Sequence, residues 1–371
     1  MNILIDINHP AHVHLYKNVY KKLIANGHAV DVVVKDIPIA QKLLELSDIP
    51  FLNIGNKKDN LFLKGLEQLR YNFKIWNLVR NKKISVGIGS SINVPHVSCF
   101  SKMTSIVSDD DDDEVEPLFV KYAHPFADVI ISPVDTPRKS KKVIYVPSYH
   151  ELSYLHPNSF IPDVSVLDDA GIKYQIESDG SVNVEKYFIL RFNAFKAHHD
   201  VGVVGLTIEN KRRLVEFLRK QGKVFITTER NVDEEFKQYQ LKVSPEKAHS
   251  FISYATMLIG DSQTMTSEAA VLGTPAIRCN TFEGRIHYLE EEEHKYELTY
   301  GFRPEHSEDM FRKIEELLSL PNLKEIWAER RQRMLSEKID YAKFLTWFIE
   351  HYPSSKDACK NADNNFWKQF K

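Results

Sequence analysis

The stretch MLIGDSQTMTSEAAVLGTPAIRC, residues 257–279, constrains the fold of this chain more than any other. Its residues predict a buried strand over Met257–Ile259, a polar turn over Gly260–Thr264 and a short helix of small residues over Met265–Leu272. A Gly-Thr-Pro break then leads into a second strand over Ala276–Cys279. Two buried strands joined by a helix form a parallel crossover unit, so the stretch predicts an α/β fold with a parallel sheet.

The same alternation of strand and helix patterns extends along most of the chain. In the first half we expect strands over Asn2–Ile7, Ala29–Val34, Phe51–Ile54, Ser85–Ile88, Thr104–Val107, Asp128–Ser132 and Val143–Val146, and helices over His12–Asn26, Ile39–Leu46, Leu61–Asn81 and Val94–Phe100. In the second half we expect strands over Lys186–Arg191, Lys223–Thr227 and Leu241–Val243, and helices over Thr207–Gln221, Pro245–Tyr254, Ile286–Glu293, Ser307–Leu318, Leu323–Glu337 and Tyr341–Tyr352.

A length of 371 residues is too great for one compact core, so we expect two domains. The predicted architecture is two Rossmann-like, doubly wound domains facing a cleft, with residues 1–165 in the first and 166–340 in the second. Residues 341–371 are expected to form a last aromatic helix and a polar tail. Ligands of such folds bind at the carboxyl ends of the strands.

Composition narrows the class of protein. A hydrophobic content of 43%, a charged content of 27% and a net charge of −2 are typical of a globular protein and argue against a nucleic-acid binder. Cys99, Cys279 and Cys359 lie far apart, which excludes a disulfide framework or a zinc motif. With no leader pattern and no apolar run long enough to span a membrane, we expect a cytoplasmic protein. The sequence leaves two further properties open: a peripheral contact with the inner face of the membrane, and assembly into a homodimer.

The turn of the opening stretch has the composition of an anion site. Asp261, Ser262, Gln263 and Thr264 lie at a helix N-terminus, where free N–H groups and the helix dipole favour a phosphate. Glu268 follows Thr264 by one helical turn on the same face, as suits a carboxylate that binds sugar hydroxyls. The alternative is an ordinary helix cap by Asp or Ser.

A histidine-rich turn follows the first strand, with the sequence NHPAHVH over residues 8–14. In a parallel sheet this turn lies at the ligand-binding edge, and histidine is suited to acid–base chemistry near neutral pH. His12 and His14 point from different helix faces, so we expect one of them to be functional and prefer His12, which is closer to the turn. The alternative is a capping or packed histidine.

Two further loops follow strands of the second half. The loop RFNAFKAHHD, residues 191–200, carries Arg191, Lys196 and His199, which are donors suited to phosphate or carboxylate. A metal site at His198, His199 and Asp200 is disfavoured, because adjacent histidines rarely converge on one ion. A solvated loop is the alternative. The loop Thr227–Arg230 is expected to meet a base or ribose, or to cap a turn.

The run Asp109–Asp113 is expected to form a solvated acidic loop. The alternative is that one aspartate faces a ligand, because the run follows a strand that ends at the ligand-binding edge. Five consecutive carboxylates define no coordination geometry for a divalent cation, so we assign no metal to them. The chain has no Gly-rich dinucleotide turn, Walker loop or nucleophile elbow, which argues against a dehydrogenase.

Four segments carry a resemblance to a known family: DINHPAHVHLYKNVYKKLIANGHAV, HPFADVIISP, RFNAFKAHHDVG and GDSQTMTSEAAVLGTPAI. Together they resemble the domain of unknown function 354 family, within the glycosyltransferase-B (GT-B) superfamily. That superfamily includes nucleotide-sugar glycosyltransferases and UDP-N-acetylglucosamine 2-epimerases.

The resemblance implies roles for several residues. Ser262, Gln263 and Thr264 stand where the epimerases have a Ser-Gly-Gly turn on the diphosphate, and Glu268 stands at the place of their ribose glutamate. The loop with Arg191 and His199 matches, by position only, a His-Arg pair near the phosphates. The Asn8–His12 turn lies where members keep an acceptor-side or catalytic loop, and the last helix crosses back onto the first domain in this fold.

The expected function is therefore an enzyme that transfers a sugar from a nucleotide diphosphate sugar to a glycan or lipid-linked acceptor, in surface polysaccharide or cell-envelope synthesis. Nucleotide and diphosphate are expected to bind Arg191, His199, Ser262, Gln263, Thr264 and Glu268. His12 is the expected catalytic base, with Asn8, His9, Pro10 and His14 in the acceptor-side loop. No metal or other cofactor is expected. A nucleotide-sugar 2-epimerase, or a hydrolysing variant of one, and a non-catalytic binding protein are the alternatives.

Overall fold

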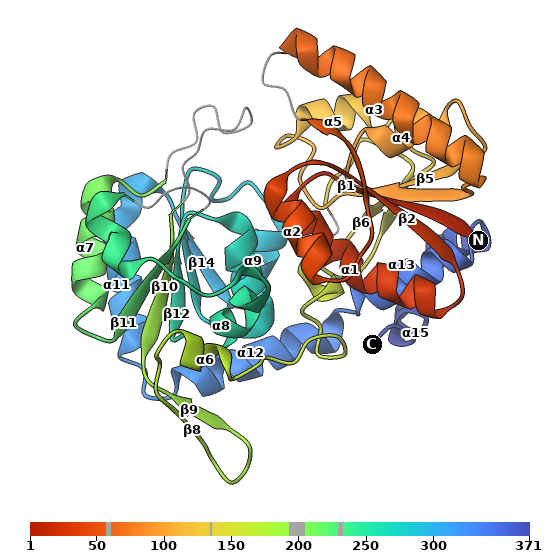
Figure 1. The fold of residues 1–371 in the computed structure, drawn as a ribbon. Coiled ribbons are helices and arrows are strands. Elements are labelled where there is room, and N and C mark those ends of the chain that lie inside the picture. The colour runs from red at the N-terminus through yellow and green to blue at the C-terminus, as the bar shows by residue number, and fades with distance from the viewer. Residues whose placement is uncertain (57–60, 134–135, 193–204, 229–232) are drawn as a thin grey trace. The chain divides into compact units, whose positions relative to one another are not determined.

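The computed structural model describes residues 1–371 except 57–60, 134–135, 193–204 and 229–232. The chain forms two compact units (Figure 1). Unit 1 consists of Met1–Ser159 and Lys338–Lys371, and unit 2 consists of Phe160–Glu337. The sequence placed the first boundary between residues 165 and 166, whereas the structure divides the chain after Ser159.

Unit 1 is built on a seven-stranded parallel sheet with the order β3-β2-β1-β4-β5-β6-β7. Its strands are β1 (Asn2–Ile7), β2 (Ala29–Asp36), β3 (Leu52–Asn56), β4 (Val86–Gly89), β5 (Thr104–Ser108), β6 (Val129–Ser132) and β7 (Val143–Tyr145). The central strands are buried on both faces, which explains their nearly continuous runs of Ile, Leu and Val. The strand order reverses between β1 and β4, and this is where ligands of doubly wound sheets bind.

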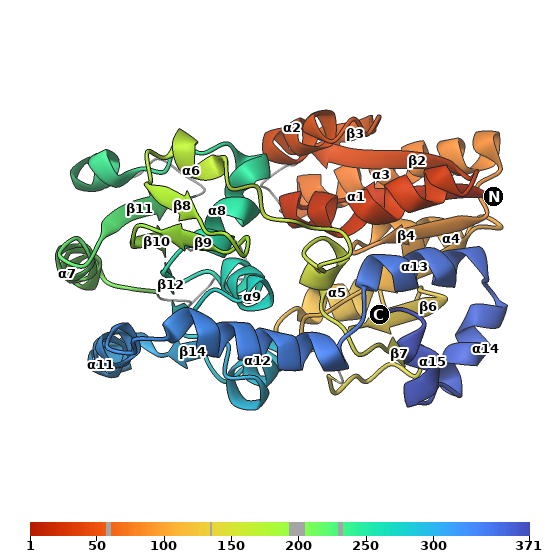
Figure 2. The ribbon, with the colours of Figure 1, turned by 90° about the horizontal axis from the view of Figure 1, so that it is seen from below.

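Helices cover both faces of the unit 1 sheet, with α1 and α2 on one face and α3 and α4 on the other (Figure 1). The helices are α1 (Pro10–Ala25), α2 (Pro38–Leu46), α3 (Leu61–Lys82), α4 (Asn93–Ser98), α5 (Pro117–Tyr122), the 3₁₀ turn η1 (His150–Ser153), α13 (Tyr341–Glu350), α14 (Ser354–Lys360) and α15 (Asn364–Lys368). The C-terminal helix α13 packs on α1 and η1, so the end of the chain completes unit 1 (Figure 2).

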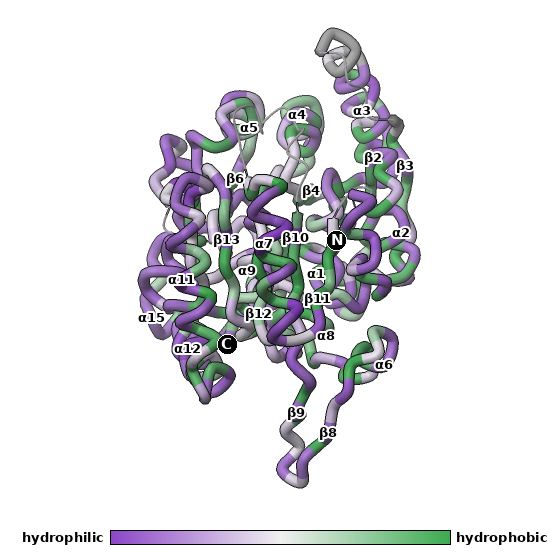
Figure 3. The backbone as a smooth tube through the Cα atoms, turned by 90° about the vertical axis from the view of Figure 1, so that its left-hand side faces the viewer, coloured by the Kyte–Doolittle hydropathy of each residue, from purple (hydrophilic) through white to green (hydrophobic). Residues whose placement is uncertain are grey.

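Unit 2 is built on a five-stranded parallel sheet with the order β11-β10-β12-β13-β14. Its strands are β10 (Tyr187–Arg191), β11 (Lys223–Thr227), β12 (Met257–Gly260), β13 (Ala276–Cys279) and β14 (Thr299–Phe302), and a separate antiparallel hairpin is formed by β8 (Tyr174–Ile176) and β9 (Val182–Val184). The middle of the sheet strand β10, Phe188–Leu190, is hydrophobic, whereas the covering helix α7 alternates between hydrophilic and hydrophobic residues (Figure 3).

In unit 2, α7 and α11 lie on one side of the sheet and α8 and α9 on the other (Figure 1). The helical segments are α6 (Val166–Asp169), α7 (Ile208–Leu218), η3 (Glu234–Tyr239), η4 (Pro245–Lys247), α8 (Ala248–Tyr254), α9 (Gln263–Leu272), α10 (His287–Glu290) with a following π-helical turn (Glu291–Lys295), η6 (Pro304–His306), α11 (Ser307–Leu318) and α12 (Leu323–Glu337).

Several strand predictions in unit 2 differ from the structure, and the short hairpin strands β8 and β9 were not predicted. The expected strand Leu241–Val243 is not a strand, because only a single bridge joins this region to the sheet, between Ile226 and Gln240. The edge strand β14, Thr299–Phe302, was not predicted, because four residues are too short to show an alternating pattern after a charged helix.

The C-terminal segment contributes an aromatic cluster to the core of unit 1. Phe344 is fully buried and lies within 5.4–6.3 Å, between ring centroids, of Tyr341, Trp347, Phe348, Trp367 and Phe370. Aromatic burial of this kind is a large source of stability.

We predict that Phe344→Ala lowers the free energy of unfolding of unit 1 by about 3–5 kcal/mol, since it leaves a cavity where an aromatic ring was buried. Phe100→Ala is the matched control, because Phe100 is 81% exposed. Urea titration followed by tryptophan fluorescence measures both. Equal destabilisation by the two variants would contradict the assignment of this segment to the core of unit 1.

Candidate active site

In unit 2, strand β12 and helix α9 are joined by a tight polar turn. Ser262 caps the helix, and its Oγ accepts a hydrogen bond from the Met265 N–H at 3.4 Å. Gly273 ends the helix in the left-handed conformation, with φ 80°. Among the described residues no acceptor is found for the N–H groups of Gln263 and Thr264, both of which are half-exposed. The turn therefore offers two backbone donors at a helix N-terminus.

Arg191 lies beside this turn, because strands β10 and β12 are hydrogen-bonded neighbours. Arg191 is in register with Gly260, and its carbonyl oxygen accepts from the Asp261 N–H at 3.1 Å. The guanidinium is largely buried, and its Nη1 donates to Thr227 Oγ1 at 3.4 Å. The structure thus brings Arg191 and the Ser262 turn to the same edge of the sheet.

Glu268 is buried on α9, and it is not a solvent-facing carboxylate of the helix surface. Its Oε1 lies 3.0 Å from Nε2 of His249, a buried residue of α8. The ring of His249 in turn packs edge-on against Phe160, with centroids 6.2 Å apart. His249 therefore holds the carboxylate in place. The sequence did not single it out, because one histidine inside a short helix carries no pattern.

A second buried arginine, also missed in the sequence, lies on the other side of Gly260. Arg278 of β13 is in register with Gly260 and with Gly301 of β14. It is 1% exposed, and its Nη2 lies 3.7 Å from Glu290 Oε1. Burial raises the pKa of the nearby Glu293 carboxyl to about 7. Arg191 and Arg278 thus flank a glycine at the carboxyl edge of the sheet, where their charge favours anions.

Several predicted residues of the second half lie outside the described residues. These are Lys196, His198, His199 and Asp200 of the first loop, and Glu229 and Arg230 of the second.

In unit 1, two histidines organise the turn from β1 into α1. His9 caps the helix through Nδ1, which accepts from the Ala11 N–H at 3.2 Å, and Pro10 occupies the first helical position. Nδ1 of His12 accepts from the Asn8 N–H at 3.3 Å. His14 points elsewhere and packs on the ring of Tyr154, with centroids 5.4 Å apart. His9 and His12 therefore both hold the backbone of the turn through their Nδ1 atoms.

The hydrogen bond from Asn8 determines what His12 can do. Burial lowers the pKa of His12 to about 3, with further lowering from His9 and His150, so the ring is neutral at pH 7. Because Nδ1 already accepts a hydrogen bond from the backbone N–H of Asn8, the hydrogen of the neutral ring is on Nε2. His12 therefore presents a hydrogen-bond donor at Nε2.

The acidic run is not a solvated loop, which corrects the expectation from sequence. Asp109, Asp112 and Asp113 are 5–8% exposed. The buried guanidinium of Arg138 contacts Asp109 at 2.9 Å and Asp113 at 3.0 Å, and His124 Nε2 lies 2.8 Å from Asp109 Oδ2. The error arose because Arg138 and His124 are distant in sequence, and a run of like charges shows nothing of its partners.

Asp6 at the end of β1 is another buried carboxylate that the sequence did not indicate. It is 0% exposed, and its Oδ2 accepts from Ser91 Oγ and, at 2.8 Å, from Asn93 Nδ2. Burial raises the pKa of this carboxyl. Asp6 thus ties β1 to the segment after β4, at the point where the strand order reverses.

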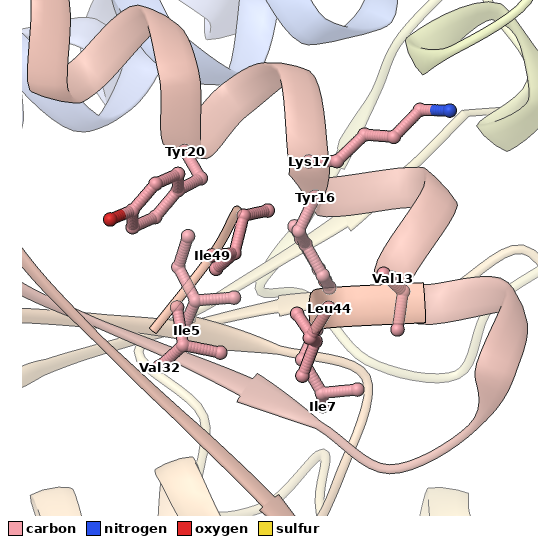
Figure 4. Close-up of a pocket in the computed structure, with 9 residues that line it drawn as sticks. All are labelled: Ile5, Ile7, Val13, Tyr16, Lys17, Tyr20, Val32, Leu44 and Ile49. Atoms are coloured by element: carbon pink, nitrogen blue, oxygen red, sulfur yellow. The ribbon is translucent and has the colours of Figure 1, made fainter. Parts of the chain in front are cut away.

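A cavity under α1 is too small to hold a ligand (Figure 4). Its volume is about 10 Å³, close to the minimum for one water molecule. The lining is almost entirely apolar and consists of Ile5, Ile7, Val13, Tyr16, Lys17, Tyr20, Val32, Leu44 and Ile49. Within the described ranges there is no cluster of His, Cys, Asp and Glu suited to a metal ion. In the same part of the chain, no helix is both long and apolar enough to cross a bilayer.

A family model described as Protein of unknown function (DUF354) matches residues 1–288. The chain belongs to this family. No curated protein matches it.

Several solved structures share the fold of this DUF354 protein at low sequence identity. S. aureus MnaA with UDP superposes with a TM-score of 0.68 at 12% identity, covering 95% of this chain and 97% of that one. The UDP-GlcNAc 2-epimerase from Neisseria meningitidis bound to UDP-GlcNAc gives 0.60 at 12%, covering 94% and 100%. The Streptomyces sp. SF2575 glycosyltransferase SsfS6 with thymidine diphosphate gives 0.58 at 12%, covering 94% and 99%. The fold is that of GT-B glycosyltransferases and these epimerases.

Gly260 is the residue of the DUF354 chain on which the β10–β12 edge depends. A Cβ at this position would lie 2.1 Å from the carbonyl oxygen of Arg191 and 3.0 Å from its Cβ. We predict that Gly260→Ala lowers the free energy of unfolding of unit 2 by about 1–3 kcal/mol, because the strands must separate.

Gly65→Ala is the control, since Gly65 lies in α3 with nothing within 4 Å of an added Cβ. Alanine favours a helix, so this variant should be unchanged or slightly more stable. Chemical denaturation compares the two. An unchanged midpoint for Gly260→Ala would show that the strands approach each other less closely than described.

Proposed function

We propose that this protein is a glycosyltransferase that takes a sugar from a nucleotide diphosphate sugar held by unit 2. The observation that carries the proposal is the N-terminus of α9, where the N–H groups of Gln263 and Thr264 lie at the carboxyl edge of the sheet beside Arg191. Backbone donors at a helix N-terminus, joined by a guanidinium, suit a diphosphate. The solved structures with UDP or thymidine diphosphate support this choice, because they share the fold.

In this proposal Ser262, Gln263, Thr264 and Arg191 bind the diphosphate, and His199 joins them. Glu268 binds the ribose hydroxyls, while His249 keeps its carboxylate in position. As the sugar leaves, negative charge grows on the diphosphate, and the helix N-terminus and the arginine stabilise that charge without a metal. Fixed dipoles of this kind favour the transition state over the ground state.

Unit 1 is proposed to bind the acceptor, a glycan or a lipid-linked sugar, through the turn that contains Asn8, His9, Pro10 and His12. His12 Nε2–H would donate a hydrogen bond to an acceptor oxygen.

Nucleotide binding tests the assignment of unit 2. We expect Arg191→Gln to weaken UDP or thymidine diphosphate about 10- to 100-fold, because a charged hydrogen bond to phosphate is lost. Glu268→Gln should weaken the nucleotides while leaving inorganic pyrophosphate unchanged, since only the ribose contact is altered. Isothermal titration calorimetry measures these affinities.

Arg213→Gln serves as the control, because Arg213 forms an exposed pair with Glu308 on α7 and α11. If no nucleotide of a UDP, GDP, CDP and thymidine diphosphate panel binds the wild-type chain, the proposal is wrong. Nucleotide binding without turnover of any sugar donor would instead indicate a binding protein.

A 2-epimerase is the second candidate, and the buried carboxylates after β5 favour it. Proton removal and return at sugar C2 need an acid and a base, and the neighbouring Asp110 and Asp111 have pKa values shifted in opposite directions, downward and upward. Epimerisation in heavy water would place deuterium at C2 of UDP-N-acetylglucosamine, whereas transfer would not. We predict no exchange at C2. Deuterium at C2, detected by mass spectrometry, would identify the protein as an epimerase and contradict the transferase proposal.

A further inference from the structure

A chain of hydrogen bonds runs through unit 1 from the C-terminal helix α13 to the acidic run. Tyr341 Oη lies 2.6 Å from Ser108 Oγ, which lies 2.7 Å from His150 Nε2. The other ring nitrogen of His150, Nδ1, lies 2.9 Å from Asp110 Oδ2. Residues from α13, β5 and η1 are thus linked in one polar network.

The chemistry of the four groups assigns the direction of each hydrogen bond. An ionised Asp110 can only accept, so His150 Nδ1 carries a hydrogen and donates it. When Nδ1 carries the only ring hydrogen, Nε2 accepts, and its donor is the Ser108 hydroxyl. Ser108 Oγ in turn accepts from the Tyr341 hydroxyl. Every donor points toward Asp110, and the network ends on that carboxylate.

Exposure decides which member can meet a ligand. Ser108 and Tyr341 are fully buried, whereas the side chains of His150 and Asp110 are 12% and 22% exposed. Ser108, His150 and Asp110 have the hydrogen bonds of a nucleophilic triad. However, a sealed serine that also binds Tyr341 cannot attack a substrate. Both ring nitrogens of His150 are engaged, so Asp110 is the reactive end.

The position of Asp110 in the sheet is that of a ligand site. It follows β5 at the carboxyl edge of the sheet, and β5 is the neighbour of β4, the strand at which the order reverses. Helix α1, which carries His12, packs against the 3₁₀ turn η1, which carries His150. This edge therefore offers a donor, His12 Nε2–H, and an acceptor, the Asp110 carboxylate, which together suit a sugar hydroxyl.

We propose that Asp110 is the catalytic base of unit 1 and that His150, Ser108 and Tyr341 position its carboxylate. The proposal rests on the proposed transferase function. In the step, the O–H bond of the acceptor hydroxyl breaks and its proton goes to Asp110. The oxygen forms a bond to the anomeric carbon of the donor sugar, and the bond from that carbon to the diphosphate breaks, its electron pair leaving with the nucleotide.

Electrostatics keep Asp110 ionised at neutral pH. Burial opposes ionisation, but His150 and Arg138 hold the pKa of Asp110 below its ordinary value. The titratable and charged groups facing this region are Asp109, Asp111, Arg138, His12, His150, Tyr16 and Tyr341. Asp110 is thus a base at every pH above its lowered pKa, and activity that depends on it should not fall between pH 7 and pH 5.

Donor turnover with water in place of the acceptor tests the proposal. UDP- and thymidine-diphosphate-linked sugars are the probes, nucleotide release is the readout, and UDP affinity is measured in parallel. We expect Asp110→Asn to reduce turnover about 10²- to 10⁴-fold with UDP affinity unchanged, as for loss of a general base. Glu114→Gln, which removes an exposed carboxylate of the same segment, is the control and should retain turnover.

Variants of His150 separate positioning from simple folding. His150→Ala should lower turnover and move the acid limb of the pH profile to higher pH, because the carboxylate loses its stabilising donor. His150→Asn keeps an N–H close to the place of Nδ1. It should therefore restore much of the turnover and return the acid limb of the pH profile toward that of the wild type. A merely structural role would change stability without moving the pH profile.

The outcomes distinguish a failure of the proposed transferase function from a failure of the proposed role of Asp110. Wild-type protein that binds no nucleotide contradicts the transferase function itself. Normal nucleotide binding with turnover in Asp110→Asn within about threefold of wild type contradicts only the role of Asp110. Independently of any substrate, ¹⁵N spectra of the His150 ring must show hydrogen on Nδ1, and a ring protonated on Nε2 alone would overturn the network.

Discussion

The parallel direction of the strands is the constraint on which the rest of this structure depends. In the main sheet of each unit all strands run the same way, so their carboxyl ends, and the polar turns that follow them, gather at one edge. Polar groups at such an edge are close to a buried core and must find partners. The polar side chains of each unit are therefore concentrated at the carboxyl ends of its parallel strands, next to the buried core.

The two units satisfy that requirement in opposite ways. The edge of unit 2 carries two buried arginines, Arg191 and Arg278, on either side of Gly260, together with backbone donors of α9. The edge of unit 1 carries buried carboxylates that are compensated by Arg138 and His124. An edge with buried arginines and backbone N–H donors suits a diphosphate, whereas an edge with carboxylates suits groups that give up protons. This contrast is the physical basis for assigning the donor to unit 2 and the acceptor to unit 1.

Sequence reasoning predicted the elements that have strong patterns and missed the partners that only folding brings together. The strands at Asn2–Ile7 and Ala276–Cys279 were predicted with their observed bounds, because their apolar runs are unambiguous. Short β14 and the pairing of Asp110 with His150 were not predicted, because four residues show no period and forty residues of chain separate that pair. The acidic run was misread for the same reason. Charge patterns in sequence describe the residues and say nothing about their neighbours in space.

The central claim is that the turn at Ser262–Thr264 binds the diphosphate of a nucleotide, and a crystal structure with UDP, GDP or thymidine diphosphate tests it most directly. The account predicts phosphate oxygens within hydrogen-bond distance of the Gln263 and Thr264 N–H groups, and ribose hydroxyls at the Glu268 carboxylate. A nucleotide bound elsewhere in the chain, with the N-terminus of α9 left to solvent, would contradict it.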